Sequence, residues 1–173
     1  MTELLILAIL LEGEFTGYKI KHKIKSNFSV FLSASFGSIH PALKKLEKSG
    51  FISTKRKMSN GGQKSSFYSV TPEGKKYFKE LMSAEIADSP LFSNQLINIK
   101  LVLLDLTDEN LRKETVNSIK RYYEIQLLNT EELLEKAEEP HLKNKEKNFM
   151  QIKFLKHHAD KISRELNWIQ SLI

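Results

Sequence analysis

The chain of 173 residues contains no cysteine. Without thiols it forms neither disulfides nor thiolate metal sites, a composition that suits a reducing cytoplasm. It also lacks a long hydrophobic run. The apolar segment 1–11 is too short to cross a bilayer and has no basic flank typical of a signal peptide. We therefore expect a cytoplasmic protein that does not contact membranes, with segment 1–11 as its first core helix.

Motifs for catalysis and metal binding are missing as well. The sequence has no nucleophile elbow, zinc-protease motif or dinucleotide-binding loop. Gly61-Gly62 is expected to form a hairpin turn, and no phosphate-loop lysine and serine follow it between a strand and a helix. The histidines His141, His157 and His158 have no carboxylates at metal-site spacing, and the last two point apart on a helix. We expect no enzymatic activity, metal or cofactor.

The charge is unevenly distributed along the chain. Residues 1–82 contain 14 Lys and Arg against 6 Asp and Glu, a net charge of +8, whereas residues 83–173 carry −2. A basic half beside a nearly neutral half is typical of a polyanion-binding domain joined to a second domain. A solvated, lysine-rich surface would give the same numbers, so charge alone leaves both interpretations open.

The most informative segment is 33–51. Ser35 can cap a helix there, and Gly50 stands where a left-handed helix stop is wanted. Apolar residues recur at helical spacing and would face a core: Ile39, Leu43 and Leu46. The other side of this helix carries hydrogen-bond donors: Ser38, His40, Lys44, Lys45 and Lys48. A short helix with small donors first and lysines behind suits insertion into a DNA major groove.

The surrounding pattern completes a small domain. The cap and proline of Thr71-Pro72 predict the start of a helix that ends near residue 84. A second helix, with Tyr18, Ile20 and Ile24 facing inward, is expected between Gly13 and the informative segment. The expected elements are helices 4–11 and 16–25, the helix from residue 35, and strands 51–57 and 66–70 around the turn 59–64. Three helices followed by a hairpin predict a winged helix-turn-helix.

The second half of the chain predicts long helices. A boundary at 88–90 precedes expected helices at 91–106, 107–138 and 145–171. In the last one, apolar residues step by four and three, as in a coiled-coil seam: Leu155, Ala159, Ile162, Leu166, Ile169 and Ile173. An antiparallel bundle within one chain would give a similar pattern. Phe154, Trp168 and Leu172 lie off the seam and need a partner, so we expect homodimerisation through this half.

The predicted fold class is mainly α with a small β-hairpin: a winged helix-turn-helix DNA-binding domain over 1–86 and a helical, coiled-coil-like dimerisation domain over 87–173. This layout favours a sequence-specific DNA-binding regulator of transcription. The alternative is a winged-helix module that binds other proteins without reading DNA. The charge split argues against that alternative, because a protein-binding module needs no such positive excess.

Three segments resemble the PadR family of bacterial transcription regulators in order and spacing: LLILAILLEGEFTGYKI, SFGSIHPALKKLEKSGFI and FYSVTPEGKKYF. They cover about residues 4–82. The second half is similar in layout to the PadR subgroup with long helical C-terminal regions. The resemblance implies a dimeric regulator, usually a repressor, that binds double-stranded DNA at a palindromic operator. It also implies release by a small aromatic or lipophilic effector.

Position by position, the resemblance implies DNA contacts from the helix and from the wing: Ser33, Ser35, Phe36, Gly37, Ser38, His40, Pro41, Lys44 and Lys64. Two departures affect this set. His40 stands where the family usually has tyrosine, and Ser65-Ser66 replace basic residues of the wing, which Lys55, Arg56 and Lys57 could compensate. Four aromatic residues either line an effector pocket or form bundle core: Tyr122, Tyr123, Phe154 and Trp168.

Overall fold

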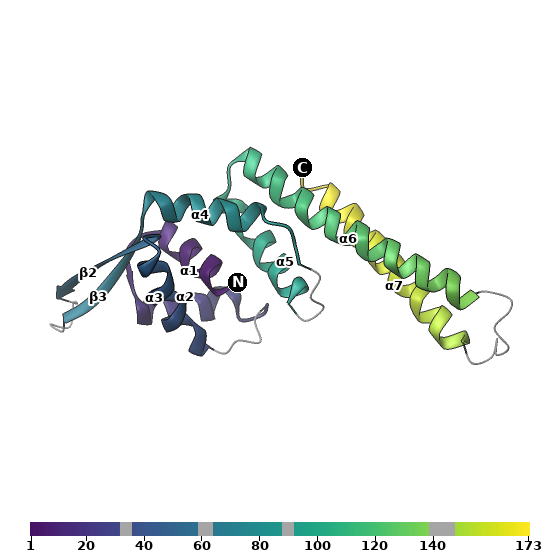
Figure 1. Ribbon diagram of the computed structural model, residues 1–173, viewed down its shortest axis with the longest axis horizontal. Coiled ribbons are helices and arrows are strands. Elements are labelled where there is room, and N and C mark those ends of the chain that lie inside the picture. The colour runs from purple at the N-terminus through teal and green to yellow at the C-terminus, as the bar shows by residue number, and fades with distance from the viewer. Residues whose placement is uncertain (32–35, 59–63, 88–91, 139–147) are drawn as a thin grey trace.

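The computed structural model describes residues 1–31, 36–58, 64–87, 92–138 and 148–173, with the side chain of Phe36 left aside. The chain forms a compact winged-helix body at one end and a long helical arm at the other (Figure 1). The predicted cap at Ser35, the turn after residue 58 and the boundary at 88–90 lie outside the described residues.

Helix α1 (Thr2–Leu11) is the centre of the body. Every residue from Leu4 to Leu10 is buried. The helix is covered by α2 (Gly17–Phe28), α3 (Ile39–Lys48), α4 (Pro72–Ser83) and strand β3 (Lys64–Val70). A helix that is apolar all round needs such complete cover. The segment read from sequence as the first core helix is therefore confirmed as one.

Helix α2 begins at a cap, since the Thr16 hydroxyl accepts a hydrogen bond from the Lys19 amide at 3.3 Å. Ile20 and Ile24 are buried, as expected. The inward placement of Tyr18 was wrong, because its side chain is 80% exposed. The core-facing residues of α2 are four positions apart, and Tyr18 lies two positions from the nearest of them, on the opposite side.

The wing is a three-stranded antiparallel sheet in the order β1-β3-β2. Strands β2 (Ile52–Met58) and β3 (Lys64–Val70) form the predicted hairpin. The short strand β1 (Phe15–Thr16), which was not among the expected elements, pairs with Tyr68 and Phe67 of β3. This third strand attaches the base of the wing to the link between α1 and α2.

One threonine connects the end of α3 with the start of α4. The Thr71 hydroxyl accepts a hydrogen bond from the Gly74 amide at 3.0 Å and donates one to the Gly50 carbonyl at 2.7 Å. Gly50 has a φ of 74°, the left-handed conformation expected of a helix stop. A Cβ at Gly74 would lie 1.9 Å from the Phe51 carbonyl oxygen, so α4 begins directly against the root of the wing.

Helix α5 (Ser93–Val102) and the 3₁₀ turn η2 (Leu103–Leu106) lead into the arm. There α6 (Glu109–Glu138) and α7 (Phe149–Gln170) lie side by side as an antiparallel hairpin that projects away from the body (Figure 1). At 1.5 Å per residue, α6 is about 45 Å long. Ile169 near the end of α7 returns to the main core, so only the base of the arm is anchored in the body.

The ammonium group of Lys100 is buried at the junction of body and arm. The side chain is 0% exposed and donates a hydrogen bond to the carbonyl of Ala84, which caps the end of α4. Burial lowers the pKa of Lys100 from 10.5 to about 8, and the nearby charge of Glu85 offsets only part of this effect. A cation at a helix C-terminus complements the helix dipole.

Candidate nucleic-acid interface

Helix α3 presents a continuous exposed face to solvent. Its inward side is fixed by burial of Ile39, Ala42, Leu43 and Leu46, and a 3₁₀ turn, η1 (Phe36–Ser38), precedes it. The helix therefore begins at Ile39 rather than at the predicted Ser35. The described residues that we expected to touch DNA from this helix are all exposed: Gly37, Ser38, His40, Pro41 and Lys44. Ser33 and Ser35 lie outside the described residues, as does the side chain of Phe36.

The contacts of α3 divide its polar residues into two edges. On one edge, the Ser38 hydroxyl lies 3.2 Å from the Thr2 hydroxyl, and Lys45 Nζ forms an ion pair with Glu3 at 2.6 Å. On the other edge, His40 and Lys44 are exposed, and Lys44 forms no ion pair within the described part of the chain. Of the two adjacent lysines, Lys44 is thus the one available to an external anion.

The register of the wing places basic residues on both of its faces. Residues directly opposite each other on antiparallel strands share a face. Arg56 opposes Ser66 and Met58 opposes Lys64, so Arg56 and Lys64 lie on one face of the hairpin. Lys57 opposes Ser65 on the other face. Strand β2 therefore supplies a basic residue opposite each serine that departs from the resemblance.

The face that carries Lys57 is partly neutralised by Glu14. This carboxylate accepts hydrogen bonds from Lys57 Nζ at 2.6 Å and from the Ser69 hydroxyl at 3.2 Å. The bond from Lys57 lowers the pKa of Glu14, although partial desolvation opposes the shift. The opposite face, with Arg56 and Lys64, has no ion pair among the described residues. That face is the better candidate for a phosphate contact.

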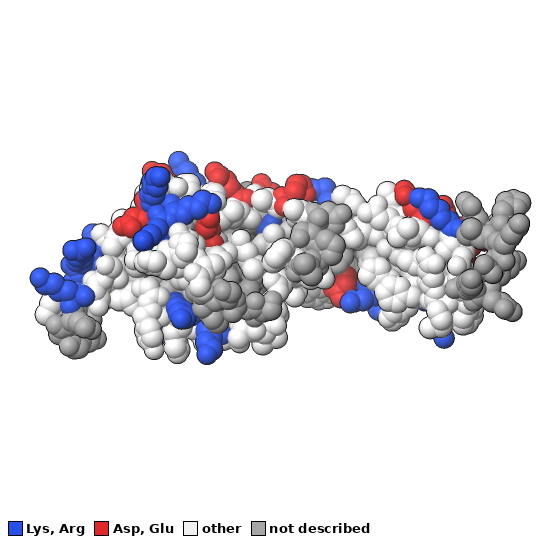
Figure 2. Space-filling view, turned by 60° about the horizontal axis from the view of Figure 1, so that its bottom comes forward, with Lys and Arg blue, Asp and Glu red and all other residues white. Residues whose placement is uncertain are grey.

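Figure 2 shows Lys and Arg side chains at the wing end of the molecule. On the body they form a group near the upper edge, with Asp and Glu side chains beside it, and smaller spots at the lower edge. The arm shows fewer charges on this face, with both signs mixed and much of its length uncharged. This distribution agrees with the charge split read from the sequence. The basic wing end is an element that a winged-helix domain uses to approach DNA.

The predicted dimerisation seam is already covered within one chain. Leu155, Ile162 and Ile169 are buried where α7 packs on α6, and Ala159 and Leu166 are half-buried. The intrachain alternative therefore describes this seam, because a period of 3.5 residues does not specify which chain supplies the covering helix. Large apolar side chains remain exposed beside it: Ile125, Leu128, Leu133, Phe149, Met150, Phe154 and Trp168.

A cavity of about 180 Å³ lies between α5, α6 and α7. Its lining residues are Asn94, Tyr122, Tyr123, Gln126, His158 and Ile162. Two of the four aromatics predicted for an effector pocket, Tyr122 and Tyr123, thus line it together. Phe154 only stacks on His158, with ring centroids 5.9 Å apart, and Trp168 is 50% exposed and takes no part in the lining. Burial raises the pKa of Tyr123 to about 12, so its phenol stays protonated.

The described residues contain no cluster of three metal-ligating side chains. Among them there is also no helix with the length and apolar character needed to cross a membrane.

An exposed, donor-bearing α3 packed against a three-helix core and followed by a basic β-wing defines a winged helix-turn-helix protein. Residues 6–80 match the model of the transcriptional regulator PadR-like family. This match falls on the part of the chain whose three sequence segments resemble the same family.

A curated relative, the negative transcriptional regulator PadR of Bacillus subtilis (strain 168), is 36% identical over 70 residues. The match spans 40% of this chain and 38% of that protein. Among solved structures, B. subtilis PadR in complex with operator DNA aligns with 98% of this chain and 94% of that one, at 20% identity and a TM-score of 0.45. The same protein in complex with p-coumaric acid aligns at 21% identity, a TM-score of 0.42 and coverages of 98% and 95%.

Proposed function

We propose that this chain is a sequence-specific DNA-binding repressor of transcription that acts in the cytoplasm as a homodimer on a palindromic operator. The observation that carries the proposal is the exposed face of α3, with Gly37, His40 and Lys44 at helical spacing, beside a wing face with Arg56 and Lys64. Side-chain donors in the major groove read base edges, and lysines on the flanking backbone fix the position of the protein.

The arm would form the contact with the second copy of the chain. In this proposal residues 1–86 bind DNA and residues 87–173 dimerise through the exposed apolar side chains of α6 and α7, including Ile125, Phe154 and Trp168. Phe154 and Trp168 are fourteen residues apart, or two heptads, so they lie on the same side of α7. A two-fold dimer would present two copies of α3 to DNA, and two-fold symmetry in the protein requires a palindromic site.

The cavity beside Tyr122 and Tyr123 is a candidate site for an effector that releases DNA. A volume near 180 Å³ accommodates one aromatic ring, and the polar groups of Asn94, Gln126 and His158 could orient a polar substituent. The cavity is lined by α5, which lies at the junction of body and arm, and by both helices of the arm. A ligand bound there would therefore change how the body and the arm pack against each other.

The deciding experiment is fluorescence anisotropy of the full chain with the DNA upstream of its own gene and with a random duplex of equal length. We expect the upstream DNA to bind at least about a thousandfold more tightly at about 150 mM salt, within the usual range of specificity ratios. Equal, weak binding of both duplexes would contradict sequence-specific recognition. No binding of either duplex at low salt would favour the alternative of a protein-binding winged-helix module.

A further inference from the structure

A single carboxylate on α1 connects three elements of the DNA-binding body. Glu3 accepts a hydrogen bond from Lys45 Nζ on α3 at 2.6 Å and another from the Tyr77 hydroxyl on α4 at 2.9 Å. The Tyr77 ring stacks on Phe51, with centroids 4.2 Å apart and an interplanar angle of 15°. Phe51 stands at the root of the wing, so Glu3 contacts α3 and α4 directly and the wing through one aromatic ring.

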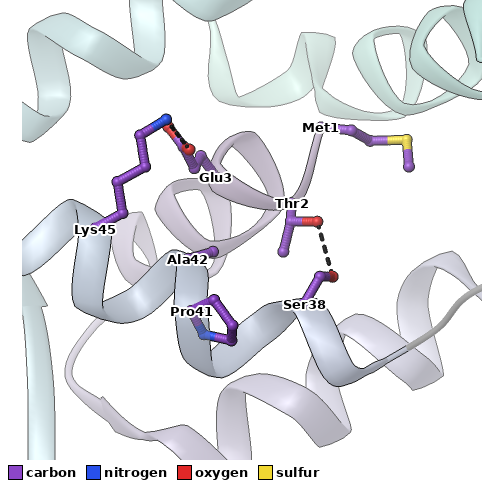
Figure 3. A pocket seen from close by; sticks show the side chains of 7 residues that line it. All are labelled: Met1, Thr2, Glu3, Ser38, Pro41, Ala42 and Lys45. Carbon is purple, nitrogen blue, oxygen red and sulfur yellow. Dashed lines mark hydrogen bonds and ion pairs between the residues drawn. The ribbon is translucent and has the colours of Figure 1, made fainter.

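The first turn of α1 contacts α3 at two points. Figure 3 shows the Glu3 contact with Lys45 and, beside it, the contact between the hydroxyls of Thr2 and Ser38. Ser38 and Lys45 are seven residues, or about two helical turns, apart. A pocket of about 360 Å³ opens between the two helices, with Pro41 on its wall. Together with the buried side of α3, these two polar contacts set the rotation and the height of the helix on the body.

Global stability alone does not account for this arrangement. The Lys45 side chain is 67% exposed, and ion pairs with such exposed partners contribute little to folding. The ion pair has a larger effect on the net charge that α3 presents to solvent. Burial by itself would raise the pKa of Glu3, but the hydrogen bonds from Lys45 and Tyr77 outweigh it and the pKa is lowered. Glu3 stays ionised, and it cancels one lysine charge on the recognition helix.

We propose that Glu3 is a specificity-determining positioning residue: it withholds Lys45 from DNA phosphates and fixes the pose of α3. The inference rests on the proposed function and deepens it. A lysine that contacts phosphates strengthens binding to every sequence alike, whereas base contacts distinguish the operator. Neutralising Lys45 lowers affinity for every sequence alike and leaves discrimination to the base-reading side chains, which the fixed pose keeps in register with the bases.

The test compares Glu3→Gln with Glu80→Gln, a change of the same charge at an exposed position of α4 that forms no ion pair among the described residues. Anisotropy is measured across a salt series with the upstream DNA and with a random duplex. For Glu3→Gln we expect several-fold tighter binding to random DNA at low salt. The log–log salt slope should steepen by about 2, or one phosphate contact per subunit, and the specificity ratio should fall. Glu80→Gln should change neither the slope nor the ratio.

Two adjacent lysines give a second test that does not require the Glu3 variant to fold. Lys44→Gln should flatten the salt slope by about 2 for the dimer and leave the specificity ratio unchanged, because Lys44 acts as a phosphate contact. Lys45→Gln should leave the slope unchanged and lower the ratio, because its charge is already cancelled and its contact with Glu3 is lost. Equal slope changes for the two lysines, or a Glu3→Gln protein with wild-type slope and ratio, would overturn the inference. A wild-type protein that binds no DNA would instead contradict the proposed function.

Discussion

The body and the arm bury their apolar side chains to very different degrees. In the body, α1 is covered on all sides, and its residues Leu4 to Leu10 are at most 2% exposed. Beyond its base, the arm has a narrow seam centred on Leu155 and Ile162, and much of its remaining apolar surface is exposed. The body therefore has a core of its own, while the arm leaves apolar surface that the proposed dimer would cover. In the proposed dimer, folding would depend mainly on the body and assembly on the arm.

The largest expected effect is the loss of stability caused by a substitution that creates a cavity in the body. Leu46 of α3 is 0% exposed, so Leu46→Ala should lower the free energy of unfolding by about 3–4 kcal/mol. Urea denaturation followed by circular dichroism measures this loss. The loss should be the same at low and high protein concentration, because it arises within one chain; a loss that depended on concentration would contradict a self-sufficient body.

The second prediction concerns substitutions that should disrupt the proposed dimer contact of the arm and leave the body folded. Phe154→Glu combined with Trp168→Glu should weaken the dimer by about 3 kcal/mol or more, since buried aromatic residues dominate interfaces. Light scattering at tens of micromolar should then report a monomer, while the helical content stays unchanged. Asn117→Glu, which adds a charge to an exposed polar position of α6, serves as the control and should remain dimeric. A wild-type monomer at this concentration would rule out the dimer.

The third prediction concerns the junction. Because the pKa of Lys100 is lowered in the folded protein, the unfolded state binds more protons between pH 8 and 10. The free energy of unfolding should therefore rise with pH across this window, by about 2 kcal/mol. Lys100→Met should remove the rise. Urea denaturation at both pH values checks it, and a wild-type stability that is flat or falls over the window would contradict the buried charge.

The fourth prediction returns to the recognition helix. Ser38→Ala and His40→Ala should each reduce discrimination between operator and random DNA by about 1–2 kcal/mol if their side chains touch base edges. Ser38 also contacts the Thr2 hydroxyl, and Thr2→Ala removes this contact while it keeps the serine. The difference between the Ser38→Ala and Thr2→Ala variants therefore reports the base contact alone. Competition binding against random duplex measures the ratio. Unchanged ratios in both α3 variants would mean that this face does not read bases.

The smallest effect is expected at the wing. Lys64→Ala should flatten the log–log salt slope by about 2 for the dimer and change base preference little, because backbone contacts carry no direct sequence information. Lys57→Ala is the comparison on the opposite wing face, where Glu14 already neutralises the charge, and its slope should change less. A wild-type slope in the Lys64 variant would mean that the wing does not contact DNA.

Features with a local signal could be predicted from the sequence. The cap at Thr71, the helix stop at Gly50 and the hairpin strands depend on neighbouring residues, and the structure confirms them. The ion pair between Glu3 and Lys45 joins residues 42 positions apart, and the strand at Phe15 forms only because β3 is beside it. Neither the ion pair nor the strand produces a pattern of residue types or spacing in the local sequence.

The seam of α7 shows a different limit. Its heptad spacing correctly predicted a buried stripe, but the covering helix is α6 of the same chain. Charged residues at Leu166 or Ile169 would therefore disrupt the arm hairpin itself, and they would not report on dimerisation alone. The exposed Phe154 and Trp168, which the sequence analysis placed off the seam, are the better probes.

The Thr71 hydroxyl has a mechanical consequence. By bonding to both Gly50 and Gly74, it closes the corner where the recognition helix, the wing root and α4 meet. These two hydrogen bonds hold the recognition helix and the wing at a fixed distance and orientation relative to each other. In the proposed complex a duplex would have to present its groove to α3 and its backbone to the wing at this fixed spacing, so any bending or twisting would occur in the DNA. With this rigid arrangement, affinity would depend on the flexibility of the operator DNA as well as on its base sequence.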